Sequence, residues 1–378
     1  KIIFASEIKS IFKFPGIPRK PNKSKLVNYC ARHYRYVDND CESFFEGVMQ
    51  VPKAEWMKIH SDGSSQKDLY WELEPILHLP PKKNESEAIE EFMHLFEHAV
   101  ELRMRSDVPV GAFLSGGMDS TTLVAIASKI NPNFQTISGV TGEGYYDESE
   151  YIQEVVDFTG VSSEFVYPQP EALFPTILEM LTFHDEPICT VTWYSMYLMV
   201  KETSKYDISV MLTGHGGDEL LAGSWGHYHD HFNDLRASEA GDRQELEAWQ
   251  RNHQRPIAEY REFRDKIRKA IDCRHFEVEK FSCYLDCLSP ELRNNETLNS
   301  IVYEMEAPSE LSRRMYLEMM YETIPASLRA EDRNFMAYSM ENRVPFLDHR
   351  LAELCFNIDN RLKIKDGLGK YILREGKQ

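Results

Sequence analysis

The residues best equipped for chemistry form one short segment, Ser115-Gly116-Gly117-Met118-Asp119-Ser120. Its two glycines let a ligand approach the backbone closely, and its serine hydroxyls add hydrogen-bond donors. A helix that begins here also presents unpaired N–H groups and a partial positive charge, so the segment predicts a cradle for phosphate. Asp119 would repel a phosphate unless a cation intervened, which implies Mg²⁺. The alternative is an ordinary tight turn between a strand and a helix.

The sequence around this segment alternates between strand and helix patterns, which predicts an α/β fold with a doubly wound parallel sheet. An apolar run at 108–114 leads into the first glycine turn, and another at 208–213 leads into a second turn, Gly214-His215-Gly216-Gly217. Ligands of such sheets bind beyond the carboxyl ends of the strands, where both turns lie. Further strands are expected at 134–140 and 164–167, and helices at 87–105, 121–130, 150–158, 173–181 and 193–203.

Local end signals and the flanking segments complete this outline. Asp147 and Glu150 resemble a capping box that opens the helix at 150–158, and Gly160 closes it. Before the alternating region, strand patterns at 51–59 and 69–71 surround a turn at 60–65, and prolines mark a linker at 76–84. After it, residues 226–378 look mainly helical. The sequence therefore predicts two units, 1–75 and 85–378.

One heavily charged stretch, at 233–268, is interpreted as a solvated helical face. Three alternate histidines, His227, His229 and His231, lie just upstream of it. Alternate histidines can bind a metal, but no further ligand of suitable spacing is evident here. We therefore interpret these three residues as part of a surface loop.

The composition limits the classes of protein to which the chain could belong. Its 43 Lys and Arg residues against 61 Asp and Glu give a net charge of −18, which argues against a general nucleic-acid or anionic-membrane binder. Of the 378 residues 42% are apolar, yet no stretch approaches the roughly 20 apolar residues of a membrane-spanning helix. The 7 dispersed cysteines are interpreted as buried reduced thiols, and a cytoplasmic location is expected.

Several motifs together resemble the asparagine synthetase family. The hexapeptide at 115–120 is the signature of the ATP-pyrophosphatase superfamily, which cleaves ATP between its α and β phosphates. The other motifs narrow the resemblance to the synthetase domain of asparagine synthetases over residues 85–378, and residues 4–9 resemble the closing part of that family's N-terminal glutaminase domain, so that 1–75 is expected to be its tail. These other motifs lie at 184–187, 212–223, 331–334, 339–348 and 369–374.

The resemblance implies an adenylation reaction. In this family a carboxylate attacks the α-phosphorus of ATP to give an acyl-adenylate and pyrophosphate, and an amine then displaces AMP. Lys370 matches the lysine that stabilises the adenylation transition state and the pyrophosphate, and Asp119 and Asp218 match Mg²⁺ ligands. The positions expected to contact the nucleotide are Leu114, Ser115, Gly116, Gly117, Asp119, Ser120, Gly139, Thr213 and Gly214.

Two departures from the family pattern concern the amine. Asparagine synthetases usually have Glu where this chain has His215, and β-lactam synthetases have Tyr there. We interpret His215 as the base that takes a proton from the attacking amine, and the alternative is a neutral, hydrogen-bonded loop residue. The chain begins Lys1-Ile2 and its first cysteine is Cys30, so these residues do not supply the N-terminal cysteine with which the family hydrolyses glutamine.

Four other charged residues leave two interpretations open. Arg333 and Arg343 could clamp a phosphate or carboxylate, or they could pair with acidic side chains inside a helical bundle. Asp185 and Glu186 precede a proline and could shape the site or only stabilise the fold. The acidic candidates for the two arginines are Asp332, Glu341 and Asp348.

Three functions are open on the sequence alone. The first is an AMP-forming amide ligase with aspartate and ammonia as default substrates. The second is a lactam- or macrolactam-forming synthetase, or an amidotransferase that acts on another carboxylate, and His215 favours it. The third, an inactive scaffold, has no chemical need for the set Ser115, Asp119, Asp218 and Lys370. The expected ligands are ATP, Mg²⁺, a small-molecule or peptide carboxylate and ammonia or an amine, and the family allows a homodimer.

Overall fold

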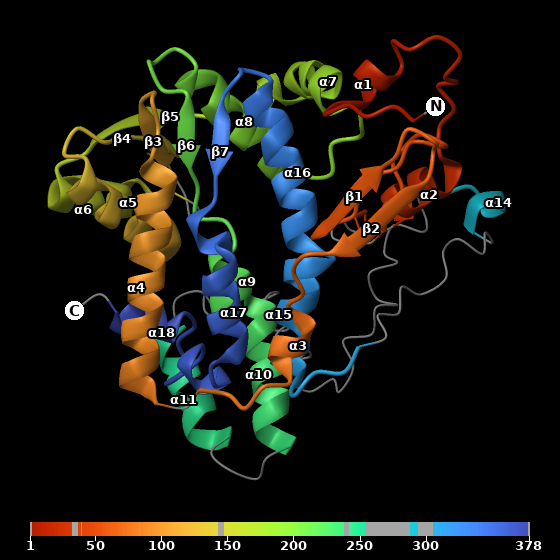
Figure 1. Cartoon of the computed structure of the whole chain (residues 1–378). Helices are drawn as coiled ribbons and strands as arrows, with labels where there is room; N and C mark the ends of the chain where they lie inside the picture. The colour runs from red at the N-terminus through yellow and green to blue at the C-terminus, as the bar shows by residue number, and fades with distance from the viewer. Residues whose placement is uncertain are drawn as a thin grey trace.

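A five-stranded parallel sheet forms the centre of the fold (Figure 1). Its strand order is β5-β4-β3-β6-β7, and every neighbouring pair is parallel. The predicted parallel α/β fold class is therefore confirmed, and the carboxyl ends of the strands share one edge. The strands are β3 (Val110–Phe113), β4 (Gln135–Gly139), β5 (Ser162–Val166), β6 (Val210–Leu212) and β7 (Glu341–Arg343).

The computed structural model describes residues 2–31, 37–38, 40–82, 84–142, 147–237, 242–253, 288–293 and 305–376. Parts of the charged stretch at 233–268 lie outside these residues, as do Cys273, Cys283 and Cys287. Of the described cysteines, Cys355 is buried as expected, whereas Cys30 is exposed, so burial of all the thiols was a wrong prediction. Within the described ranges, none of the helices is both long and apolar enough to cross a membrane.

Helices cover both faces of the sheet because neighbouring residues of a strand point to opposite sides. On β3, Ala112 belongs to a hydrophobic cluster with Leu123 of α5 (Met118–Ile130). The next residue, Phe113, belongs to a second cluster with Val200 of α8 (Val191–Thr203). Burial on both sides explains why the central strands β3 and β6 are continuous apolar runs in the sequence. The helices packed beside α5 and α8 are α4 (Glu85–Met104), α6 (Ser149–Thr159), α7 (Leu173–His184) and α16 (Thr323–Met336).

The region after β6 is mainly helical, as predicted, and most of its helices gather below the sheet in the view of Figure 1. Within it, α10 packs against α15, which also contacts α9 and α16. These helices are α9 (Gly217–Leu221), α10 (Trp225–Ala237), α11 (Asp242–Asn252), α14 (Pro290–Arg293), α15 (Glu310–Met320), α17 (His349–Asn357) and α18 (Tyr371–Glu375). Single 3₁₀ turns lie at Pro170–Ala172, Pro345–Leu347 and Asn360–Leu362.

The N-terminal part consists of α1 (Ile8–Ile11), α2 (Lys23–Ala31), an antiparallel pair β1 (Glu55–Ile59) and β2 (Ser65–Leu69), and α3 (Glu74–Leu77). It is bonded to the sheet-containing part at several points. The Lys9 N–H donates to Asp185 Oδ2 at 3.0 Å, and the Tyr29 hydroxyl donates to the Ile188 carbonyl at 2.8 Å. The division of the chain into two units remains a prediction.

Three local predictions need correction. The strand expected from residue 51 begins at Glu55, since Ala54 has a left-handed φ of +55°. The expected capping box is not formed, because the Asp147 carboxylate accepts from Gly142 N–H and the Ser149 hydroxyl while Glu148 is the N-cap. The sequence also missed β7, whose three residues are polar and charged and carry no strand pattern. Gly160 does end α6 in the left-handed conformation, as predicted.

Candidate active site

The first glycine turn joins β3 to α5 at the carboxyl edge of the sheet. Leu114 is buried, and its N–H donates to the Ile137 carbonyl of β4 at 3.0 Å. The Ser120 hydroxyl accepts from Ser115 N–H at 3.1 Å and lies 3.0 Å from the Ser115 hydroxyl. Ser115 Oγ in turn accepts from Gly117 N–H at 3.3 Å. The two predicted serines therefore fold the turn onto the start of α5.

The two glycines of this turn have separate structural reasons. Gly116 has a left-handed φ of +75°, and a Cβ atom there would lie 2.9 Å from Tyr151 Cβ. Gly117 is the N-cap of α5 and provides no side-chain cap. The first N–H groups of this 13-residue helix are therefore open to an external acceptor, as the predicted phosphate cradle requires.

Three segments that are far apart in the sequence meet at the Lys370 ammonium group. Lys370 Nζ donates to Asp119 Oδ2 at 2.6 Å and lies 2.5 Å from Asp218 Oδ1. The two aspartates lie in the first turns of α5 and α9, and Lys370 directly precedes α18. A Cβ atom at Gly217 would overlap the Asp119 carboxyl group, and one at Gly223 would overlap Asp218 and Lys370. The glycines at both ends of α9 thus leave room for this three-residue cluster, which we call the lysine cluster.

The electrostatics of the lysine cluster are those of one cation between two anions. Burial raises the pKa of Asp119, and Asp218 raises it further, while Lys370 acts in the opposite direction. Burial disfavours the charged amine, yet the two carboxylates raise the pKa of Lys370 above its ordinary value. Lys370 is therefore an ammonium ion at neutral pH.

The same carboxylates fit a divalent cation. Asp119 Oδ1 is buried and has no hydrogen-bond partner among the described residues. Mg²⁺ is commonly held by one or two protein carboxylates together with substrate phosphates and water, so Asp119 and Asp218 form a suitable donor pair. No group of three His, Cys, Asp or Glu side chains that could hold a metal ion is found in the described part of the chain.

The remaining nucleotide positions predicted from the sequence lie at the same edge of the sheet. Gly139 ends β4, and a Cβ atom there would lie 2.8 Å from Met199 Sδ. Thr213 follows β6, and its buried Oγ1 has no partner among the described residues. A Cβ atom at Gly214 would lie 3.1 Å from Asp119 Cβ, so this glycine lets the two turns approach each other.

His215 pairs with an acidic residue that the sequence analysis treated only as part of a motif. Its Nδ1 lies 2.5 Å from Oε1 of the buried Glu331 on α16. The other Glu331 oxygen accepts from the Asn342 amide of β7. Burial opposes protonation, but the carboxylates of Glu331, Glu219 and Asp218 raise the pKa of His215 to about 9. His215 is thus a cation near neutral pH and must release a proton before it can act as a base. The strand β7, which packs against α16 and bonds Glu331, was not predicted. The sequence therefore offered no reason to place Glu331 opposite His215.

The two arginines with open roles have partners within the fold. Arg343 Nε donates to Glu341 Oε1 at 2.8 Å, and Nη1 donates to two backbone carbonyls at 2.7 Å, those of Arg103 and Arg105. Arg333 Nη1 lies 3.6 Å from Asp332 Oδ2. These contacts favour the structural interpretation for Arg343 in particular, because its guanidinium holds the end of α4 against the sheet.

Asp185 and Glu186 likewise contact charged residues of other segments. Besides the contact of Asp185 with Lys9, Glu186 Oε1 lies 2.6 Å from Nε of the partly buried Arg329, which also pairs with Asp38. Asp185 has a left-handed φ of +60° at the end of α7. Their partners lie in the N-terminal part and on α16, which favours a role in packing.

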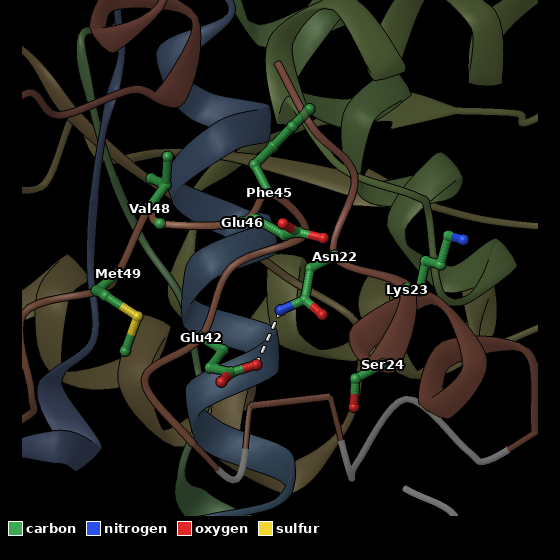
Figure 2. A pocket seen from close by; sticks show the side chains of 9 residues that line it. Asn22, Lys23, Ser24, Glu42, Phe45, Glu46, Val48 and Met49 are labelled. Carbon is green, nitrogen blue, oxygen red and sulfur yellow. Dashed lines mark hydrogen bonds between the residues drawn. The ribbon is translucent and has the colours of Figure 1, made fainter. Parts of the chain in front are cut away.

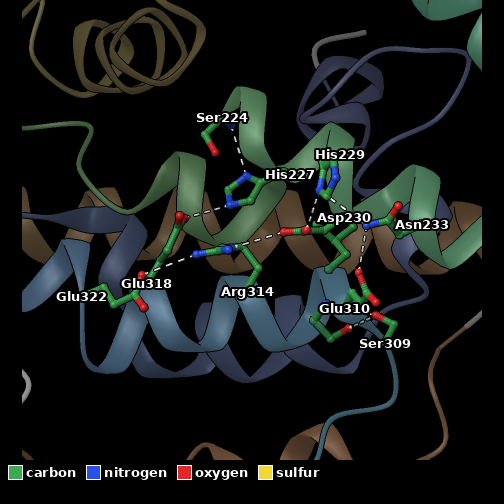
Figure 3. A network of polar contacts seen from close by, with 12 residues as sticks. Ser224, His227, His229, Asp230, Asn233, Ser309, Glu310, Arg314, Glu318 and Glu322 are labelled. Carbon is green, nitrogen blue, oxygen red and sulfur yellow. Dashed lines mark hydrogen bonds and ion pairs between the residues drawn. The ribbon is translucent and has the colours of Figure 1, made fainter. Parts of the chain in front are cut away.

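The three alternate histidines do not lie in a surface loop, so that interpretation was wrong. All three are buried on α10, and Figure 3 shows two of them, His227 and His229. His227 Nδ1 accepts from Ser224 N–H at 3.1 Å, and its Nε2 lies 2.8 Å from Glu318 Oε2. A carboxylate from a helix about 90 residues away stabilises this buried imidazole, and a single-sequence pattern cannot reveal such a distant partner.

A cavity of about 390 Å³ lies in the N-terminal part, between the start of α2 and residues 42–49 (Figure 2). Its lining includes Glu42, Glu46 and Asn22, and Asn22 Nδ2 donates to Glu42 Oε2 at 2.8 Å. The lining shares no residue with the lysine cluster or with either glycine turn. The predicted chemistry is therefore not associated with this cavity.

Sequence comparisons find relatives along nearly the whole chain. Asparagine synthetase [glutamine-hydrolyzing] 1 of Bacillus subtilis is 24% identical over 395 residues, which cover 99% of this chain and 59% of the relative. The putative asparagine synthetase [glutamine-hydrolyzing] 2 of Methanocaldococcus jannaschii is 32% identical over 62% of this chain and 44% of the relative. Amidase chry2 of Gibberella zeae is 26% identical over 59% of this chain and 35% of the relative. The chain thus spans about three fifths or less of the length of these proteins.

A solved structure, the NH3-dependent NAD synthetase of Campylobacter jejuni, matches with 13% identity and a TM-score of 0.25 over 37% of this chain and 60% of that one. This match is too partial to support any conclusion about the fold beyond the parallel sheet described above. The family model for asparagine synthase matches residues 91–376. Because this match covers well over half of the 378 residues, the chain belongs to the asparagine synthase family.

Proposed function

We propose that the chain catalyses ATP-dependent, AMP-forming amide formation. A carboxylate is adenylated with release of pyrophosphate, and ammonia or an amine then attacks the adenylate and releases AMP. The observation that carries this proposal is the Lys370 ammonium between Asp119 and Asp218, beside the open N-terminus of α5. Membership of the asparagine synthase family supports the same chemistry, and relatives named asparagine synthetases make aspartate the default carboxylate.

In the adenylation half, the chain supplies positive charge where the substrate is most negative. The N–H groups at the start of α5 and the Ser115 and Ser120 hydroxyls bind the phosphates. Lys370 stabilises the negative charge that grows on the pyrophosphate as the bond to the α-phosphorus breaks. Bound Mg²⁺, held by Asp119 and Asp218, would neutralise further charge on the phosphate oxygens. Because Lys370 contacts both aspartates, a substitution at any one of these three residues changes the electrostatic environment of the other two.

In the amine half, His215 and Glu331 form the pair that handles the proton. An attacking ammonium or amine must lose a proton to complete the amide, and an imidazole within reach of a carboxylate can accept it. The buried Glu331 orients the ring through Nδ1, which leaves Nε2 as the accepting atom once His215 is neutral. Replacing His215 with Phe should leave adenylation intact and abolish amide formation. Unchanged turnover by this variant would rule out the base role.

The alternative is amide formation on another carboxylate, as in a lactam- or macrolactam-forming synthetase or an amidotransferase. The specific observation in its favour is His215, since the family's asparagine-forming members usually carry Glu at that position. A relative named as an amidase, from Gibberella zeae, shows that family relatives are not all named as asparagine synthetases. The amine of such a substrate would reach the same His215–Glu331 pair.

The test is ATP–pyrophosphate exchange with aspartate as the only carboxylate. Exchange that depends on aspartate supports asparagine synthesis, and exchange that appears only with a peptide or modified amino acid supports the alternative. The nucleotide product is measured in the same assay mixture. Formation of ADP in place of AMP would contradict the whole proposal.

A further inference from the structure

The segment that carries Lys370 is held from outside by α11. We call residues 365–370 the lysine loop. The Glu245 carboxylate of α11 accepts two backbone N–H groups of this loop, from Asp366 at 3.1 Å and from Gly367 at 2.7 Å. Asn252, at the end of the same helix, donates to the Asp366 carbonyl at 2.8 Å. One helix therefore bonds both the N–H and the C=O side of the loop.

A tyrosine of α10 holds the other end of the lysine loop. The hydroxyl of Tyr228, which is 8% exposed, accepts from Gly369 N–H at 2.6 Å. A Cβ atom at Gly367 would overlap the Trp249 backbone of α11, so the loop lies directly on that helix. The rings of Tyr228 and Trp249 are 6.1 Å apart, which joins the two contacts into one surface.

The backbone of the lysine loop explains why such support is needed. Asp366 and Lys370 both have left-handed φ values, +52° and +56°. For residues other than glycine this conformation costs on the order of 1 kcal/mol each, and it persists only where the surroundings enforce it. Lys370 itself makes two backbone bonds, from its N–H to the Leu221 carbonyl and from the Arg374 N–H to its own carbonyl, both at 3.0 Å. The bonds at Asp366, Gly367 and the Gly369 N–H come from side chains of α10 and α11, so these two helices share in holding the strained loop.

We propose that Glu245 and Tyr228 are positioning residues that hold the lysine loop so that the Lys370 ammonium lies between Asp119 and Asp218. Neither residue contacts the lysine cluster directly, so each acts through the backbone of the loop. The consequence for catalysis rests on the proposed function, because it assumes that Lys370 stabilises the adenylation transition state. The structural part, a loop held by two side chains, does not depend on it.

The structural part is tested by hydrogen–deuterium exchange of the loop amides in the full chain. Glu245→Ala should speed exchange at Asp366 and Gly367, and Tyr228→Phe should speed it at Gly369, each by about tenfold or more, because the acceptor is lost. Glu245→Gln keeps one acceptor oxygen and should lie between. The control is Glu247→Ala on the exposed side of α11, where Glu247 pairs only with Arg243 at 3.4 Å among the described contacts. Unchanged loop exchange in Glu245→Ala and Tyr228→Phe would overturn the proposal.

The catalytic part is tested by pyrophosphate exchange kinetics. Glu245→Ala and Tyr228→Phe should each lower kcat about tenfold while KM for ATP changes less than about twofold. A misplaced ammonium weakens transition-state stabilisation more than ground-state binding. In a Lys370→Ala background the same substitutions should cause no further loss. A full additional loss there would contradict action through Lys370. If the wild-type chain shows no exchange with any carboxylate, the proposed function fails, while the amide-exchange result still decides whether α10 and α11 hold the loop.

Discussion

Two polar clusters of the molecule use similar side chains in opposite ways. In the lysine cluster, two carboxylates share one ammonium, and a buried oxygen of Asp119 has no partner among the described residues. Where α10 meets α15, each of the buried carboxylates Glu318, Asp230 and Glu322 faces a basic side chain, His227 or Arg314, and we call this network the histidine cluster (Figure 3). There His227 meets Glu318 at 2.8 Å, and Arg314 Nε donates to Asp230 at 3.2 Å.

The difference shows how a binding site can be told from a structural network. Carboxylates beside a glycine turn that leave a buried oxygen without a partner cost stability unless a ligand compensates them, whereas buried carboxylates that each face a basic side chain between packed helices need nothing from outside. Burial alone does not separate the two, because both contain residues that are largely shielded from solvent. The distinction predicts that damage to the lysine cluster affects activity, while damage to the histidine cluster affects stability.

The largest expected effect comes from removing the shared cation. Lys370→Ala should reduce kcat for ATP–pyrophosphate exchange about 10³-fold, equivalent to about 4 kcal/mol of transition-state stabilisation. Because the two aspartates also lose their shared cation, its thermal midpoint should fall as well, so kcat is compared per folded molecule. The control is Lys201→Ala, which removes a half-exposed lysine paired with Glu179 at 3.1 Å. If Lys370→Ala lost much of its stability while its folded fraction kept full activity, the lysine cluster would be a structural network and not a binding site.

Breaking one pair in the histidine cluster should have the next largest effect. Glu318→Ala leaves His227 buried and without its carboxylate, and removal of one partner of a buried pair costs about 3 kcal/mol. Urea unfolding should show this loss as a lower midpoint. Glu310→Ala on the same helix is the control, because that exposed side chain bonds the Asn233 amide and should cost less than about 1 kcal/mol. Equal midpoints for the two variants would mean that the His227–Glu318 pair adds no stability.

Within the lysine cluster, charge can be removed while shape is kept. Asp119→Asn keeps an acceptor for Lys370 but loses the charge that a divalent cation needs. Exchange should fall about 100-fold, or about 2.7 kcal/mol, and the Mg²⁺ concentration for half-maximal rate should rise. The matched control is Asp157→Asn, which changes an exposed aspartate bonded by Gln153. An Asp119→Asn variant with full activity and unchanged Mg²⁺ dependence would refute the metal assignment.

The lysine cluster was the more predictable of the two. Its glycines and hydroxyls are local in sequence, and strand patterns at 108–114 and 208–213 placed both turns at one edge of the sheet. Parallel pairing then brings Asp119 and Asp218 together, as the structure shows through their common contact with Lys370. The family resemblance supplied the part that spacing could not, the lysine about 150 residues further along the chain.

The histidine cluster and the His215–Glu331 pair could not be predicted for a shared physical reason. Each depends on a contact between segments far apart in the sequence, whose relative placement no local pattern encodes. His227 was assigned to a surface loop because no further metal ligand was evident, yet it is buried with Glu318 Oε2 2.8 Å from its Nε2. Glu331 belonged to a recognised motif, but its position opposite His215 depends on α16 and on the unpredicted strand β7.

The smallest effect concerns pH and tests whether His231, on α10 beside α11, stays uncharged. Burial lowers the pKa of His231 to about 4, and Glu245 Oε1, at 3.9 Å from Nε2, is too far for a hydrogen bond. The unfolded chain binds this proton near pH 6.5 but the folded chain does not, so stability falls as pH drops from about 6.5 towards 4. For His231 alone the loss between pH 7 and pH 5 is about 2 kcal/mol.

Between pH 7 and pH 5, His231→Phe should lose about 2 kcal/mol less of its free energy of unfolding than the wild type does. The measurement is urea unfolding at these two pH values. His184, whose pKa burial also lowers to about 4, keeps its own contribution, so only the difference between variant and wild type counts. His60→Phe in the exposed turn between β1 and β2 should leave the pH dependence unchanged. If His231→Phe loses as much stability on acidification as the wild type, His231 accepts its proton in the folded state. Burial beside α11 would then not keep the His231 imidazole neutral.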